Sequence, residues 1–262
     1  MMKQTFLALA LSCPIVAASA EPAPCPGNAD ALGTERTLAV AAATTPRVGR
    51  KQFPQTLPLE PKEVVLTFDD GPWPGTTQKI LAALKRECVK ATFFMLGRNV
   101  EAHPELAWAV REAGHVVGHH TYAHRLLDRI PMAAAQAEID HGIAAVERAL
   151  YGGAAAKPVT PFFRFPGFAS RPDLLDWLEK RQLVVFGTDL WASDWIRMSP
   201  GAELGLVLAR LQAAGRGIIL LHDTKSQTAA MLPIFLRELK RRGYRIVQAV
   251  PAAPDSPLTP PL

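Results

Sequence analysis

The chain lacks a long hydrophobic run, a strong excess of charge, an internal repeat and more than three cysteines. Its N-terminal apolar stretch, residues 6–11, is too short to cross a membrane as a helix, which needs about 20 residues. The formal net charge of +5 in 262 residues is mild and does not indicate a nucleic-acid-binding protein. These absences exclude a membrane-spanning helix at this stretch and give no support to a nucleic acid partner.

Residues 1–20 have the composition of a secretory signal peptide. Lys3 is their only charge, an apolar core follows it, and Ala18-Ser19-Ala20 provides the small residues of a cleavage site. A buried N-terminal helix is one alternative, and a lipoprotein signal at Cys13 is another, although the residues before Cys13 match that pattern poorly. We therefore expect a secreted or periplasmic protein without stable membrane insertion after cleavage.

The remaining chain divides by composition. Residues 21–61 are rich in Pro, Ala and Thr and predict a linker, and residues 251–262 contain five prolines and predict a disordered tail. Residues 62–250 are long enough for one domain with a sizeable core. Cys25 and Cys88 remain after signal cleavage, and export permits a disulfide between them, but two cysteines alone do not decide this.

Short apolar runs alternate with helical patterns through residues 62–250. Helices are predicted over 132–150, 171–181 and 200–214, where leucine, isoleucine and valine recur at helical spacing. Alternation of this kind indicates an α/β fold with parallel strands. Seven strands are predicted, over residues 63–68, 91–95, 115–118, 162–165, 183–187, 217–221 and 245–248.

Polar residues follow the C-terminal ends of five of these strands. In a barrel of parallel strands these ends share one face, where active sites are built. Scattered structural polar residues would not be expected to choose that end five times. The residues concerned are Asp69 and Asp70, then His119, His120 and His124, then Arg164, then Asp189 and Asp194, then His222 and Asp223.

Two segments carry the chemistry. Residues 67–72 (TFDDGP) place two adjacent carboxylates after a strand, and residues 120–124 (HTYAH) supply two imidazoles four positions apart, as on one helical turn. One carboxylate and two imidazoles form an open three-ligand metal site, and the second carboxylate is then free to act as a base. The alternatives are an Asp pair that only forms a turn and histidines that are only structural. His119 should point away from His120 if strand geometry continues.

Other residues at the same face suggest further roles. His222 closes a buried strand and is suited to protonate a leaving group, with a hydrogen-bonding core residue as the alternative. Arg164 lies among phenylalanines and needs a carboxylate partner if it is buried. Asp194 offers a carboxylate beside Trp195, whose alternative role is ordinary packing.

Together these motifs resemble the polysaccharide deacetylase family, which has the NodB homology domain and forms carbohydrate esterase family 4. Residues 67–72 are similar to its first motif, His120 and His124 to its second, and Leu221-His222-Asp223 to its fifth. The resemblance spans residues 62–250. It implies a single-domain, distorted (β/α) barrel with seven parallel strands. It also implies a metal-dependent hydrolase of carbon–nitrogen bonds other than peptide bonds, which removes acetyl groups from N-acetylated sugars.

The resemblance also implies a role for each matching residue. Asp70, His120 and His124 would bind a divalent metal, with zinc expected and cobalt or manganese as alternatives. Asp69 would be the general base and His222 the general acid. The supporting residues would be Arg164, which orients the base, Asp194, Gly167 through its oxyanion-binding N–H, and Trp195 and Leu221 in the acetyl pocket.

The chain departs from the family pattern at two positions. Gly167 stands where the family has an aromatic residue, and Trp191 stands where the fourth motif has an aspartate, for which Asp189 is a candidate substitute. These departures affect the choice of substrate more than the chemistry. We expect an exported enzyme that releases acetate from peptidoglycan or a chito-oligosaccharide. The alternatives are a non-catalytic carbohydrate-binding protein on the same fold and a metal-dependent amide hydrolase acting on a small molecule. The expected partner is an N-acetylated carbohydrate, and the oligomeric state is not predicted.

Overall fold

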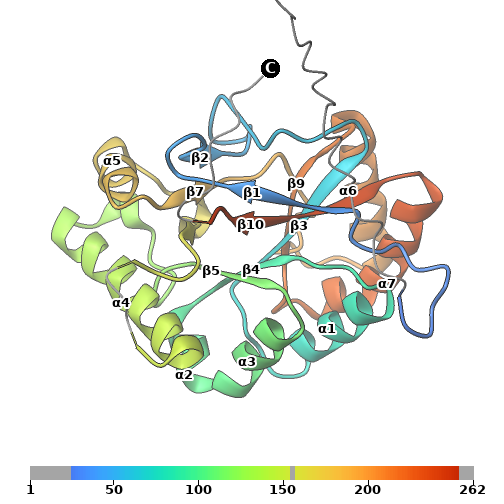
Figure 1. Cartoon of the computed structure of the whole chain (residues 1–262), viewed down its shortest axis with the longest axis horizontal. Helices are drawn as coiled ribbons and strands as arrows, with labels where there is room; N and C mark the ends of the chain where they lie inside the picture. The colour runs from blue at the N-terminus through green and yellow to red at the C-terminus, as the bar shows by residue number, and fades with distance from the viewer. Residues whose placement is uncertain (1–24, 154–156, 254–262) are drawn as a thin grey trace, which may run out of the picture.

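A computed structural model describes residues 25–153 and 157–253 of the chain (Figure 1). The predicted signal peptide, residues 1–20, lies outside the described residues, as do residues 254–262 of the predicted tail. Across the described ranges, no helix combines the length and the hydropathy needed to span a bilayer.

The centre of the molecule is a sheet in which all the described strand pairs are parallel. Seven of its ten described strands coincide with the predicted ones, so the predicted parallel α/β fold is confirmed. These seven are β3 (Glu63–Asp69), β4 (Thr92–Met95), β5 (Val116–His119), β6 (Phe162–Phe163), β7 (Val184–Phe186), β9 (Gly217–His222) and β10 (Arg245–Pro251). The other three, β1 (Arg36–Val40), β2 (Arg47–Val48) and β8 (Leu190–Trp191), were not predicted.

The strand order is β1-β10-β3-β4-β5-β6-β7-β2, and β9 pairs with both β3 and β8. No strand pair among the described residues joins β2 to β8, so the ladder does not close into a ring. The loop after β2 crosses this gap. The N–H of Lys51 donates to the Thr188 carbonyl at 2.9 Å, and the N–H of Arg50 donates to Asp189 Oδ1 at 2.9 Å.

Seven described α-helices surround the strands (Figure 1). The three predicted helices appear as α4, α5 and α6, each within two residues of its expected ends. In α6, Ser199 Oγ accepts the N–H of Ala202 at 3.2 Å, which satisfies one of the free donors of the first turn. The helices are α1 (Thr76–Arg86), α2 (Gly97–Ala102), α3 (Pro104–Glu112), α4 (Met132–Tyr151), α5 (Pro172–Lys180), α6 (Pro200–Ala214) and α7 (Ser226–Arg241).

Strand β3 is buried along its whole length and orients the residues that follow it. Val64, Leu66 and Phe68 belong to the core cluster between the sheet and helices such as α1 and α7. Val65 belongs to a second cluster on the opposite face, together with side chains from several other strands. Because successive strand residues point to opposite faces, Thr67 and Asp69 share the inner face with Val65.

The predicted linker over residues 21–61 is wrong for the described residues 25–61. Strand β1 pairs with β10, and β2 pairs with β7, so this segment is part of the sheet. Arg36 Nη2 also lies 2.7 Å from Glu63 Oε2 at the start of β3. The composition of residues 25–61 did not reveal these two strands, because both pair with strands far along the chain. The predicted tail is corrected at its first residue, since β10 extends to Pro251.

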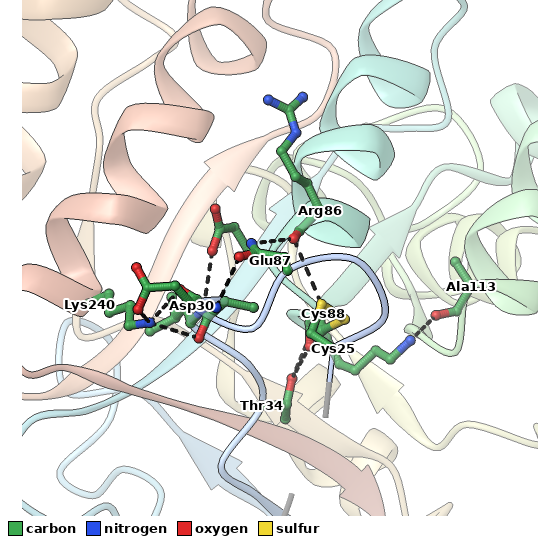
Figure 2. Close-up of a disulfide and its surroundings, with 12 residues drawn as sticks. Cys25, Asp30, Thr34, Arg86, Glu87, Cys88, Ala113 and Lys240 are labelled. Carbon is green, nitrogen blue, oxygen red and sulfur yellow. Dashed lines mark hydrogen bonds and ion pairs between the residues drawn. A yellow bond between two sulfur atoms is a disulfide. The ribbon is translucent and has the colours of Figure 1, made fainter. Parts of the chain in front are cut away.

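A disulfide joins Cys25 to Cys88, the residue that follows α1 by two positions (Figure 2). Hydrogen bonds continue this attachment along the N-terminal segment. The N–H of Leu32 donates to Glu87 Oε2 at 3.0 Å, and Thr34 Oγ1 donates to the Cys88 carbonyl at 3.2 Å. The segment before β1 is thereby fixed to the domain by covalent and polar contacts.

Candidate active site

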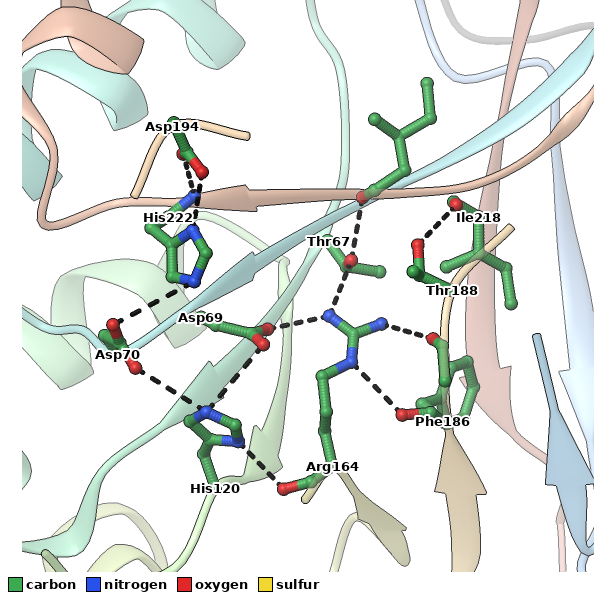
Figure 3. A network of polar contacts seen from close by, with 12 residues as sticks. Thr67, Asp69, Asp70, His120, Arg164, Phe186, Thr188, Asp194, Ile218 and His222 are labelled. Carbon is green, nitrogen blue, oxygen red and sulfur yellow. Dashed lines mark hydrogen bonds and ion pairs between the residues drawn. The ribbon is translucent and has the colours of Figure 1, made fainter. Parts of the chain in front are cut away.

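Asp69 and Arg164 form a buried ion pair on the inner face of the sheet (Figure 3). Arg164 Nη1 donates to Asp69 Oδ1 at 2.7 Å and to Thr67 Oγ1 at 2.8 Å. The rest of the guanidinium donates to the carbonyls of Phe186 and Gly187. Burial raises the pKa of Asp69, and the Arg164 charge opposes that rise. The pairing fixes Oδ1 and leaves Asp69 Oδ2 to face the imidazole of His120, 3.8 Å from Nε2.

Asp70 reaches the same site because the chain turns at this residue. Its φ of 76° lies in the left-handed region, which aspartate tolerates better than most residues. The Asn99 side chain holds the turn by donating to the Asp70 carbonyl at 2.7 Å. The next residue must be glycine, because a Cβ on Gly71 would lie 2.0 Å from Asp223 Oδ2.

His120 follows β5 and has a fixed tautomer. Its Nδ1 lies 2.8 Å from the carbonyl oxygen of Arg164, which only accepts, so Nδ1 carries the proton and Nε2 presents its lone pair to the site. Burial lowers the pKa of His120 to about 3, which keeps the imidazole neutral. A neutral imidazole with its second nitrogen held by a carbonyl is a typical metal ligand.

His124 comes to the site by an irregular turn, whereas its spacing from His120 suggested a helical turn. Thr121 and His124 have φ values of 68° and 63°, and no helix covers residues 120–124. The N–H of His124 donates to Thr121 Oγ1 at 3.1 Å, which closes the turn. The imidazole is more exposed than that of His120, with 36% of its side chain accessible.

The three predicted metal ligands meet at one oxygen atom. Asp70 Oδ1 lies 3.5 Å from His120 Nε2 and 3.4 Å from His124 Nε2. It is buried and has no hydrogen-bond partner among the described residues. One ligand atom from each residue lies within 4.8 Å of the others. A buried carboxylate oxygen facing two imidazole nitrogens fits a divalent cation such as zinc, which prefers this combination of ligands.

His222 lies on the other side of Asp70, with its Nε2 4.0 Å from Asp70 Oδ2 (Figure 3). Its Nδ1 donates to Asp194 Oδ1 at 2.7 Å, and its backbone N–H donates to Asp194 Oδ2 at 2.7 Å. Thr228 Oγ1 also donates to this carboxylate, at 2.8 Å. Burial alone would lower the pKa of His222. The hydrogen bond and charge of Asp194, with the charges of Asp69 and Asp70, outweigh it and raise that pKa to about 9.

A hollow of about 480 Å³ opens over these groups. Gly167 and Trp195 line it, as expected for residues near the acetyl group. Leu221 does not line it, which corrects its predicted place, because its side chain is buried in the core cluster on the helix side of the sheet. Leu220 lines the hollow instead, since residues two apart on a strand share a face and Leu220 shares that of His222. The two-residue alternation of side chains along a strand was enough to identify Leu220, not Leu221, as the residue on the same face as His222.

Three polar residues of the sequence analysis lie outside this group, and one of them, Asp223, is buried and accepts the Thr77 hydroxyl at 2.6 Å. His119 is fully buried, and its Nε2 donates to the Thr160 carbonyl at 3.0 Å, away from the three ligand residues. Asp189 accepts hydrogen bonds from the loop after β2 and from the Ile218 N–H, and it contacts neither His222 nor Arg164. Thr228, whose hydroxyl donates to Asp194, was not predicted as a site residue, because nothing in the helical pattern of α7 distinguishes it.

A carboxylate–imidazole triad beside a second carboxylate, on a parallel α/β fold, is an arrangement that metal-assisted hydrolases use. The sequence model of the family described as polysaccharide deacetylase matches residues 56–185. The chain belongs to this family.

Named relatives agree with that assignment. The chain is 34% identical over 186 residues to the peptidoglycan-N-acetylglucosamine deacetylase PgdA of Listeria monocytogenes, over 71% of this chain and 38% of that protein. It is 31% identical over 243 residues to a chitin deacetylase of Colletotrichum lindemuthianum, over 86% of this chain and 95% of that protein. The solved structure of the Bdellovibrio bacteriovorus peptidoglycan deacetylase Bd3279 matches with a TM-score of 0.73 and 35% identity, over 84% of this chain and 59% of that one. The chain therefore spans well under half the length of the Listeria relative.

Proposed function

We propose that this protein is an exported, metal-dependent hydrolase that removes N-acetyl groups from an amino-sugar polymer or oligomer and releases acetate. The observation that carries the proposal is the geometry around Asp70. Its unpartnered Oδ1 faces two imidazoles, Asp69 Oδ2 lies 3.8 Å from one of them, His120, and His222 Nε2 lies 4.0 Å from Asp70 Oδ2. The named activities of the relatives support an N-acetylated glycan as the substrate.

Asp70, His120 and His124 would hold the metal, for which zinc is the first choice and cobalt or manganese the alternatives. A divalent cation bound there would polarise the acetyl carbonyl and lower the pKa of a bound water. Asp69 accepts the proton of the attacking water on Oδ2, because Arg164 already occupies Oδ1. Arg164 keeps the carboxylate oriented during this transfer.

The departing sugar amine needs a proton, since an amide nitrogen is a poor leaving group without one. His222 donates it from Nε2, because Nδ1 is held by Asp194. The backbone N–H of Gly167, at the edge of the same hollow, donates to the negatively charged oxygen of the tetrahedral intermediate. Trp195 and Leu220 surround the acetyl methyl group.

The decisive experiment measures acetate release by the exported form, residues 21–262, from N-acetylated peptidoglycan and from a chito-oligosaccharide. Release that a chelator abolishes and added zinc restores is the expected result. Glycan binding without acetate release would instead identify a non-catalytic binding protein. Release only from small amides would identify a small-molecule amide hydrolase.

Export is proposed from the composition of residues 1–20. The exported protein should begin at Glu21. N-terminal sequencing of the protein recovered outside the cytoplasm checks this, and a chain that still begins at Met1 would contradict it.

A further inference from the structure

A second hollow adjoins the proposed acetyl pocket. It has a volume of about 430 Å³ and lies between β8, the loop after β2 and the last turns of α6. Trp191 of β8 lines both this hollow and the one above the catalytic residues. We call the second one the Trp191 hollow. The two hollows therefore share one wall residue.

Two cations line the Trp191 hollow. Lys51 Nζ lies 5.1 Å from the centre of the Trp191 ring, and the Lys51 backbone is held by its hydrogen bond to Thr188. Arg210 Nη1 donates to the Trp191 carbonyl and to Ser193 Oγ, both at 2.7 Å. Within the described part of the chain, neither Lys51 nor Arg210 has a carboxylate within ion-pair distance. Both positive charges are therefore available to a ligand.

The carboxylate of Asp189 also lines the hollow, but protein donors already hold it. Its Oδ1 accepts the Arg50 N–H at 2.9 Å. Its Oδ2 accepts the Thr56 hydroxyl at 2.7 Å and the Ile218 N–H at 2.8 Å. Asp189 thus anchors the wall of the hollow, and its negative charge beside the two cations leaves the lining with a net charge of +1, which favours an anionic ligand.

The spacing suits neighbouring sugars of one chain. The ring centres of Trp191 and Trp195 are 6.0 Å apart, and those of Trp195 and His222 are also 6.0 Å apart. Two indole rings therefore separate Lys51 from the proposed general acid. Lys51 lies over one face of the Trp191 ring, so a sugar bound against Trp195 has a cation nearby that is placed to bind a charged substituent on the adjacent sugar.

We infer that the Trp191 hollow binds a carboxylate on the sugar next to the one that loses its acetyl group, through Lys51 and Arg210. This inference rests on the proposed function and narrows the substrate to N-acetylated glycans that carry carboxylates. Two sources have this chemistry: the free lactyl carboxylate of muramic acid, and the carboxylates of a peptide joined to the lactyl group through an amide bond. It also gives Trp191, which departs from the family pattern, a role in substrate choice.

The test compares three tetrasaccharides of alternating N-acetylglucosamine and N-acetylmuramic acid. One has free lactyl carboxylates, one has these converted to primary amides, and one has stem peptides attached through them. The wild-type protein should show a higher kcat/KM for a carboxylated glycan than for the amide. Lys51→Glu should reduce this preference about twofold to fivefold, mainly through KM, because exposed ion pairs contribute modestly. Raising the ionic strength should also reduce the wild-type preference for the carboxylated glycan, because salt screens the ion pairs.

Lys180→Glu is the matched control, because Lys180 is an exposed lysine at the C-terminal end of α5 and lines neither hollow. It should keep the wild-type preference. If Lys51→Glu lowers kcat/KM mainly on the glycan with free lactyl carboxylates, the lactyl group is the ligand. If it lowers kcat/KM mainly on the glycan with stem peptides, the peptide is the ligand. Equal rates on all three glycans, or the same change in Lys180→Glu, would overturn the carboxylate inference and leave the proposed function standing. Acetate release from a chito-oligosaccharide but from none of these three glycans would overturn the carboxylate inference alone, and release from none of the four substrates would overturn both.

Discussion

At the scale of single residues, the site depends on which atom of each side chain is already occupied. Arg164 occupies one oxygen of Asp69, the Arg164 carbonyl occupies Nδ1 of His120, and Asp194 occupies Nδ1 of His222. Each group is left with a single atom directed at the reaction. The residue types could be predicted from the sequence, but these assignments of atoms required the three-dimensional contacts.

Metal binding should depend on the three residues that meet at Asp70 Oδ1. Substituting alanine for Asp70, His120 or His124 should remove most of the bound metal, because each change leaves only two ligands. His119→Ala is the control and should keep its metal, since His119 bonds to the Thr160 carbonyl instead. Metal content of the purified proteins by elemental analysis checks this. Full occupancy in both His120→Ala and His124→Ala would refute the ligand assignment.

The pH dependence of turnover should report the Asp194–His222 pair. A general acid must be protonated, so activity should fall as the pH rises through the His222 pKa, which is raised to about 9. Asp194→Asn removes a negative charge and an acceptor, so it should lower that pKa and move the alkaline limb to lower pH. Turnover at neutral pH should fall about 10–100-fold, which is typical when a supporting partner is lost.

The measurement is kcat as a function of pH for both proteins, with metal content determined in parallel. Constant metal content shows that the change acts on His222 and leaves the metal ligands intact. An unchanged alkaline limb in Asp194→Asn would mean that another group is the acid.

At the scale of elements, Asp189 connects the loop after β2 to the start of β9. Asp189→Asn leaves at least one of its three part-buried or exposed donors facing an NH₂ group, and the loss of one such hydrogen bond costs about 1 kcal/mol. The free energy of unfolding should fall by about that amount, while kcat on an uncharged substrate should change much less than in Asp194→Asn. Denaturant unfolding and turnover assays on the two variants separate these effects. If Asp189→Asn lowers turnover and Asp194→Asn does not, then Asp189 supports catalysis, Asp194 is structural, and the present assignment is wrong.

The elements that could be predicted are those whose signal is local. The seven predicted strands are apolar runs, and the polar residues do cluster at their C-terminal ends. Strands β2 and β8 contain only two residues each, which is too short for any periodicity, whereas the equally short β6 lies among the phenylalanines of residues 162–165. Strand β1 alternates partly buried and exposed residues up to the buried Val40, but its partner is β10, where Arg36 pairs with Val247. A pairing over that separation leaves no mark on local composition, so the segment resembled a linker.

At the scale of the whole molecule, the N-terminal segment is held at two places. Strand β1 adds to the sheet beside β10, and the disulfide attaches Cys25 to Cys88 near the end of α1. The disulfide closes a loop across a sequence separation of 63 residues. A cross-link over a loop of that length restricts the unfolded chain more than the folded one, and this stabilises the fold.

Cys88→Ser should therefore lower the free energy of unfolding by about 2–4 kcal/mol, and Cys25→Ser should cause the same loss because either change removes the same bond. Turnover should stay close to wild type, since neither cysteine lines the catalytic hollow. Guanidinium unfolding with and without a reductant provides the measurement. Reductant should bring the wild-type midpoint down to that of the variants and leave the variants unchanged. If reductant does not move the wild-type midpoint, the segment before β1 is held by its hydrogen bonds and strand pairing, and the disulfide contributes nothing to stability.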